Sequence, residues 1–216
     1  MERVTVYIDG YNFYYGLRRL RENDSDWQKF YWIDFVKFFQ NFLSASQVLQ
    51  KVCYFTASPK NLPKATRQAV LFEANKLINE ERFEVIKGYF YEKETICNYC
   101  GKTTKRPEEK QTDVNISIKM MGDCVQNNTD TVILVSADSD LVPPLKYIKE
   151  FYPEKKIRIY FPPNNFSFEL YSMMKADKKK VVMLEKNKVK FFNSILPDVV
   201  SKDGKSYTIP AKWKVT

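Results

Sequence analysis

Two short runs of hydrophobic and mostly β-branched residues occupy distant parts of the chain. Residues 4–8 read VTVYI and residues 131–135 read TVILV. Continuous runs of this kind are typical of strands that are buried on both faces of a parallel sheet. Similar runs predict further strands at residues 48–56, 83–91, 156–161 and 181–184.

Segments with helical spacing of hydrophobic residues alternate with these strands. They predict helices at residues 11–21, 33–43, 63–80, 112–125, 141–151 and 167–175. Because strands and helices alternate, we predict an α/β, Rossmann-like fold with a mostly parallel sheet of about five to six strands flanked by helices.

Two segments interrupt this alternation and define the expected domain organisation. Residues 1–175 are expected to form the domain, with residues 92–109 as an excursion over its surface. Residues 176–216 are expected to add an edge strand and an irregular, basic tail that packs on the domain.

Acidic residues directly follow both of the opening strands. Asp9 ends the first strand, and Asp138 follows the run at 131–135, between Ser136 and Asp140. The carboxyl ends of parallel strands meet at one edge of the sheet, where α/β folds bind their ligands. Carboxylates gathered there repel one another unless a cation or raised pKa values relieve the repulsion. Since Mg²⁺ prefers carboxylate oxygens, the pattern predicts a magnesium-type site, although each acid could instead cap the following helix.

Asp113 is the third candidate ligand, near the start of the helix predicted at 112–125. Ile116, Met120 and Cys124 share one face of this helix at four-residue spacing, and Asp113 lies near the beginning of the same stripe. A carboxylate on an inward face is unfavourable in a purely structural role. Asp123, further along the helix, is a weaker candidate.

The composition excludes several classes of enzyme. The 216 residues include no histidine, which excludes Ser-His-Asp and Cys-His mechanisms and histidine-bound zinc. The first turn, DGYNF at residues 9–13, lacks the glycines of a dinucleotide site, and Tyr11 stands where an aspartyl phosphatase would carry a second acid. No run approaches the roughly 18–20 apolar residues of a membrane helix, and we expect no signal peptide before the first strand. We expect a cytoplasmic protein without membrane contact.

Cys97 and Cys100 have the spacing of a zinc knuckle. A closed zinc site needs four ligands, and the remaining cysteines, Cys53 and Cys124, lie in unrelated segments. A second copy of the chain in a homo-oligomer could supply another pair. Structural Zn²⁺ and a pair of reduced thiols are the two alternatives.

The net charge of +9 is concentrated near the C-terminus, where residues 175–216 contain eleven lysines and four acids. A basic tail beside an acidic centre suits a polyanionic substrate, and Lys178, Lys179 and Lys180 are the candidate nucleic-acid contacts. Lysines that merely keep the surface soluble explain the charge alone equally well.

Three motifs together resemble the NYN domain family, a branch of the PIN-like nucleases. They are YIDGYNF at residues 7–13, EKQTDVNI at 109–116 and VSADSDLVPP at 135–144, and the likeness extends over roughly residues 3–175. Residues 161–167 and 196–213 resemble a bacterial subgroup of the family that often carries a CxxC insertion.

The resemblance implies a PIN-like fold and a ribonuclease that uses Mg²⁺ or Mn²⁺ to hydrolyse RNA. It assigns the metal ligands to Asp9, Asp113 and Asp138, with support from Asn12, Ser136 and Asp140. Family members often have an acid at the position of Lys119. That departure is either harmless or weakens a second metal site, so the alternative is a degenerate module that binds RNA or a protein partner without cleavage.

Overall fold

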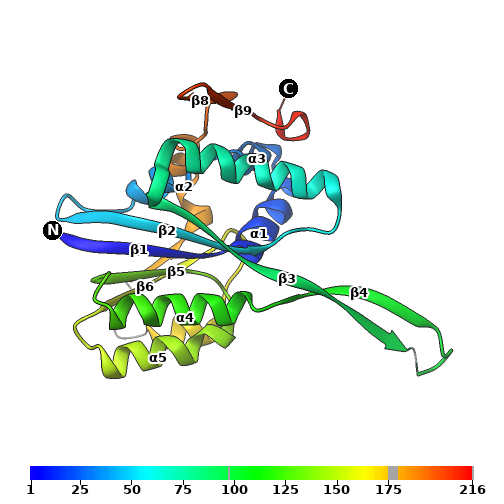
Figure 1. Cartoon of the computed structure of the whole chain (residues 1–216). Helices are drawn as coiled ribbons and strands as arrows, with labels where there is room; N and C mark the ends of the chain where they lie inside the picture. The colour runs from blue at the N-terminus through cyan, green and yellow to red at the C-terminus, as the bar shows by residue number, and fades with distance from the viewer. Residues whose placement is uncertain (97, 175–179, 216) are drawn as a thin grey trace.

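A seven-stranded sheet forms the centre of the protein (Figure 1). The computed structural model describes residues 1–96, 98–174 and 180–215, apart from the side chains of residues 106 and 107. Over these residues the strand order is β4-β3-β2-β1-β5-β6-β7, and all neighbours are parallel except β3 and β4. The predicted α/β fold with a mostly parallel sheet is confirmed. The strands are β1 (Glu2–Asp9), β2 (Gln47–Ala57), β3 (Phe83–Ile96), β4 (Thr103–Lys110), β5 (Thr131–Val135), β6 (Lys156–Phe161) and β7 (Val181–Met183).

Helices pack on both faces of this sheet. The central strand β1 explains why, since Val4, Val6 and Ile8 belong to one buried cluster and Tyr7 to the other. A strand that is apolar on both faces needs a cover on each. One side carries α1 (Gly10–Asn23), the 3-10 helix η1 (Ser25–Tyr31), α2 (Phe35–Gln40), α3 (Leu62–Asn79) and α7 (Lys188–Phe192). The other side carries α4 (Thr112–Val125), α5 (Val142–Phe151) and α6 (Phe168–Met173).

Strands β3 and β4 form a hairpin arm that extends beyond the body of the domain (Figure 1). Most of residues 92–109, which the sequence predicted as an excursion over the domain surface, belong to the two strands of this hairpin. Tyr89 pairs with Lys110 at the root of the arm, and Ile96 pairs with Thr103 near its tip. Residues 91–96 are exposed. Hydrogen bonds between the two strands, and not a buried hydrophobic face, therefore stabilise this part of the arm.

The C-terminal segment is more regular than the sequence predicted. After β7 and α7, strands β8 (Val199–Lys202) and β9 (Lys205–Thr208) form a second, antiparallel hairpin. Val200 and Trp213 are buried in the same cluster as α1 and α2, and the ring of Trp213 lies 5.8 Å from that of Tyr31. The segment therefore completes one face of the core.

Among the described residues, no helix is both long enough and apolar enough to cross a membrane.

Candidate metal centre

Asp9 lies at the junction of β1 and α1, and only 2% of it is exposed. It is the N-cap of α1, and its carboxylate accepts a 3.0 Å hydrogen bond from the backbone N–H of Asn12. The Asn12 side-chain amide and the Ser136 hydroxyl, at 2.8 Å, both donate to Oδ2. The capping alternative and the ligand role are thus compatible, because one carboxylate oxygen serves the helix while its neighbours fix the other.

Asp138 follows β5 in the loop that leads into the 3-10 helix η3 (Ser139–Leu141). Its Oδ1 accepts a hydrogen bond of 2.9 Å from the backbone N–H of Asp140, and its own N–H donates to Ser136 Oγ at 3.0 Å. Ser136 therefore links the Asp9 carboxylate to the Asp138 backbone. Asp140 itself is exposed, and its carboxylate does not belong to the central cluster.

Asp113 approaches from the opposite side, in the first turn of α4. Ile116 and Met120, on the same face of α4 as Asp113, are buried, as the spacing predicted. Within the described part of the chain, no group donates a hydrogen bond to its carboxylate.

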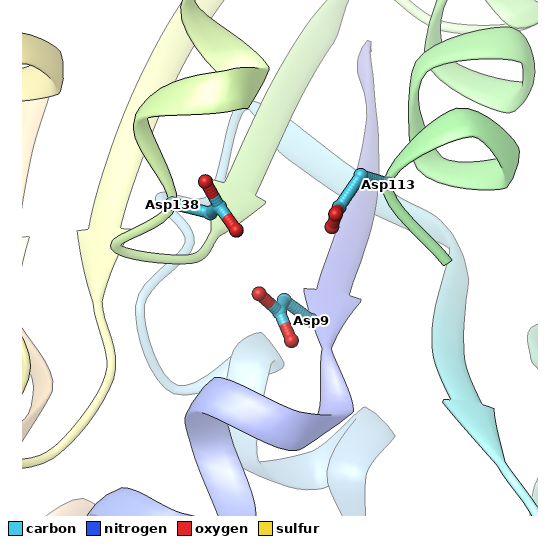
Figure 2. Close-up of side chains that lie close together, drawn as sticks. All are labelled: Asp9, Asp113 and Asp138. Atoms are coloured by element: carbon cyan, nitrogen blue, oxygen red, sulfur yellow. The ribbon is translucent and has the colours of Figure 1, made fainter. Parts of the chain in front are cut away.

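The three carboxylates converge although they come from three distant segments (Figure 2). Asp9, Asp113 and Asp138 each offer one oxygen, and these oxygens all lie within 4.8 Å of one another. They line a small cavity of about 110 Å³. The sheet brings the first and third together because β1 and β5 are parallel neighbours that end at the same edge.

Two of the clustered acids, Asp113 and Asp9, have raised pKa values, and burial is the main cause. Burial raises the pKa of Asp113 to about 6, and the charges of Asp138, Asp9 and Asp140 add to the effect. Burial also raises the pKa of Asp9, although hydrogen bonds from Asn12 and Ser136 oppose it. Such crowding is the electrostatic condition that a divalent cation relieves.

Glu109 is a fourth acid that the sequence reasoning did not select as a site residue. It lines the small cavity, and its carboxylate accepts a hydrogen bond of 2.5 Å from Thr112 Oγ1. Burial raises its pKa, and the charge of Asp113 contributes. Its place four residues before Asp113, in the same sequence motif, was the signal that could have identified it.

Lys119 does not face the acidic cluster. Its ammonium group contacts Asp123 at 2.9 Å, and the other oxygen of Asp123 accepts a hydrogen bond of 2.8 Å from the Tyr7 hydroxyl. Asp123, the weaker candidate ligand, is therefore engaged in a buried structural network. The departure at Lys119 creates a separate ion pair on the same helix.

The predicted zinc ligands and nucleic-acid-binding lysines receive less support. Cys97, Lys178 and Lys179 lie outside the described residues. Cys100 is exposed near the tip of the arm, Cys53 and Cys124 are buried elsewhere, and the described residues contain no cysteine cluster that could hold zinc.

Lys180 is partly buried, and three other lysines of the tail, Lys188, Lys202 and Lys214, form ion pairs with acids of the chain. Lys188 contacts Asp24 at 2.6 Å, and Lys214 contacts Asp198 at 2.8 Å.

Comparisons with known proteins identify the family to which this chain belongs. A 6-hydroxy-3-succinoylpyridine 3-monooxygenase from Pseudomonas putida is 26% identical over 180 residues, which cover 68% of this chain and 55% of that protein. The chain thus spans about half the length of this curated relative. The crystal structure of a protein of unknown function from Vibrio parahaemolyticus aligns with a TM-score of 0.49 and 20% identity, covering 79% of this chain and 88% of that one. Residues 3–175, which include all three clustered carboxylates, match the NYN domain, and the chain belongs to the NYN domain family.

Proposed function

We propose that the protein is a metal-dependent ribonuclease that hydrolyses RNA phosphodiester bonds at the Asp9, Asp113 and Asp138 cluster. The observation that carries this proposal is the convergence of three carboxylates within 4.8 Å at the carboxyl edge of the sheet. Keeping three acids this close is unfavourable without a cation. NYN domains are generally nucleases, which supports the same reaction class.

The donor set fits Mg²⁺ or Mn²⁺. Both are hard cations that take oxygen ligands, and Mg–O distances of about 2.1 Å place neighbouring ligand oxygens roughly 3 Å apart. The three oxygens, which lie within 4.8 Å of one another, would have to draw closer to reach that spacing around a bound ion. When bound, the ion activates a water molecule and stabilises the charge that develops on the scissile phosphate.

Hydrogen bonds orient two of the three carboxylates. Ser136 and Asn12 hold the Asp9 carboxylate in one orientation, and the Asp140 N–H holds that of Asp138. Asp113 lacks such a donor among the described residues and is free to adjust to a ligand. Glu109, which lines the same cavity, would accept a proton from an attacking water.

An oxygenase activity like that in the name of the Pseudomonas relative has less support in this chain. The first strand–helix turn carries Asp9 and Asn12 in place of a glycine-rich phosphate-binding loop, and its polar groups are directed to the acidic cluster. The relative also extends well beyond the matched region.

The test is cleavage of end-labelled single-stranded and structured RNA by wild type and Asp138→Asn, with Mg²⁺, Mn²⁺ or EDTA. Asparagine retains the acceptor for the Asp140 N–H, so the variant should fold. Loss of a ligand should lower the rate by more than the roughly 10- to 100-fold typical of outer-shell changes. Glu150→Gln is the control, because Glu150 is exposed on α5 and lies outside the cluster.

Equal cleavage by wild type and Asp138→Asn would reject the proposed metal centre. Absence of cleavage with every metal, together with gel-shift binding of RNA in EDTA, would favour the non-catalytic binding module.

A further inference from the structure

A second and larger cavity lies beside the acidic one. It has a volume of about 420 Å³ and is lined by residues of α1, η1, the first half of α3 and the end of β2. This is the size of a typical small-molecule site. Tyr11 lines both cavities, and Gly10, which lies in the wall of the larger one, directly follows Asp9. The two cavities are therefore adjacent.

The wall of this cavity contains a buried hydroxyl without a partner. Tyr31 is 5% exposed, and its Oη forms no hydrogen bond within the part of the chain that the structure describes. Buried hydroxyls are normally paired, because an unpaired one loses its hydrogen bonds to water without replacement. Burial raises the pKa of Tyr31 to about 12, so the group is neutral and can donate. The hydroxyl oxygen is covered in this structure, so a bound molecule that offers an acceptor would satisfy it after a small shift of the neighbouring side chains.

The remaining wall is largely aromatic, and its solvent side is cationic. The rings of Tyr14 and Trp213 lie 5.6 Å and 5.8 Å from that of Tyr31. Lys64 and Arg67, on the first turns of α3, line the cavity and form no ion pair with any described residue. This combination suits a planar, polar ring attached to an anion.

We propose that the cavity binds one unpaired nucleobase of the RNA substrate, from a nucleotide next to the scissile phosphate. The base enters among the aromatic rings, the Tyr31 hydroxyl donates to one of its acceptors, and Arg67 and Lys64 contact the adjoining phosphate. The assignment rests on the proposed ribonuclease function. Tyr11 lines both cavities, so a base in the larger one would lie next to the proposed metal centre.

The consequence is a preference for single-stranded RNA. A base held in a duplex cannot enter this cavity without being unpaired and unstacked, which costs free energy before cleavage. The nucleotide in the cavity also fixes the register of the chain, so the cleaved bond should lie at a constant offset from that base.

The first experiment measures binding independently of cleavage. AMP, GMP, CMP and UMP are titrated into the full chain in EDTA by calorimetry, with Tyr31→Phe, Arg67→Ala and the control Lys149→Ala. Tyr31→Phe removes only an unpartnered hydroxyl, so it should fold normally and weaken binding roughly 3- to 10-fold. Arg67→Ala should weaken it about 10-fold or more. Lys149, exposed on α5 on the other side of the sheet, should have no effect.

The second experiment locates the base relative to the cut. Single-stranded RNAs that carry one abasic nucleotide at successive positions are cleaved by wild type with Mn²⁺. Removal of the bound base should slow cleavage of one bond by about 10-fold or more, at a constant offset, while other positions have little effect.

The outcomes separate this proposal from the nuclease itself. Nucleotide binding that depends on Tyr31 and Arg67, without any cleavage, would support the base site and reject the nuclease. Cleavage that depends on Asp138, with abasic positions all equivalent and nucleotide binding unaffected by either variant, would overturn the base site alone. Binding of a small aromatic carboxylate such as nicotinate, with no nucleotide binding, would also overturn it.

Discussion

Replacing Asp113 by asparagine should stabilise the metal-free protein at neutral pH, although it removes a proposed ligand. The Asp113 carboxylate accepts no hydrogen bond from any described residue, so the amide loses no partner. Its pKa is raised from 3.8 to about 6 by burial and by the neighbouring acids. The folded protein therefore holds this proton more tightly than the unfolded chain does. The resulting destabilisation of the wild type develops as the pH rises from about 4 to 6 and is complete above that range.

The size of this effect follows from the pKa shift. A shift of about two units corresponds to at most about 3 kcal/mol, and partial exposure of Asp113 reduces this to about 1–2 kcal/mol. Asp113 also lies in the first turn of α4, where a negative charge gains about 0.3–1 kcal/mol from the helix dipole. The expected net gain for Asp113→Asn is about 1 kcal/mol at pH 8.

Urea unfolding in EDTA at pH 4, 6 and 8 measures this gain for Asp113→Asn against wild type and Glu150→Gln. The gain should be absent at pH 4 and present at pH 8. Added Mg²⁺ should then stabilise the wild type, because it binds only the folded state, and should stabilise Asp113→Asn much less. A variant that is no more stable than wild type at pH 8, or that responds fully to Mg²⁺, would refute this account of the cluster.

Two further substitutions probe the surroundings of the centre. Lys119→Ala should lower the free energy of unfolding by about 2–3 kcal/mol, because it leaves the buried Asp123 carboxylate without its cation. The cleavage rate per folded molecule should stay unchanged. A loss of rate at unchanged stability would contradict this. Ser136→Ala removes the hydrogen bond to Asp9 and the acceptor for the Asp138 N–H, so the Mg²⁺ affinity measured by calorimetry should fall about 10- to 100-fold. An unchanged affinity would show that Ser136 does not orient these ligands.

The central strands and their acidic ends could be predicted from the sequence because burial on both faces leaves a clear pattern. Val4 to Ile8 reads as continuous apolar sequence, and Asp9 and Asp138 follow strands that must end at the same edge. Asp113 was accessible through the stripe that it shares with Ile116. These inferences need only local periodicity and the rule for parallel sheets.

The hairpin arm and the larger cavity could not be predicted in this way. The outer part of the arm is exposed on β3, so it carries no burial pattern, and its structure depends on pairing between two segments. The cavity brings together Tyr31 and Trp213, which are far apart in the chain. The partner of Lys119 was within reach, since Asp123 lies four residues along the same helix.

The root and the tip of the hairpin arm differ in how much change they tolerate. At the root, Gly88 lies so close to Lys110 that an added Cβ would stand 2.4 Å from the Lys110 carbonyl oxygen. After Lys110, Gln111 has a φ of 74° and α4 begins at once, which sets the position of Asp113. The tip at Gly101 has open space around it. Insertions and deletions at the tip can therefore accumulate during evolution without disturbing the acidic cluster, whereas the root tolerates almost none, so the arm can diversify in length while the chemistry stays fixed.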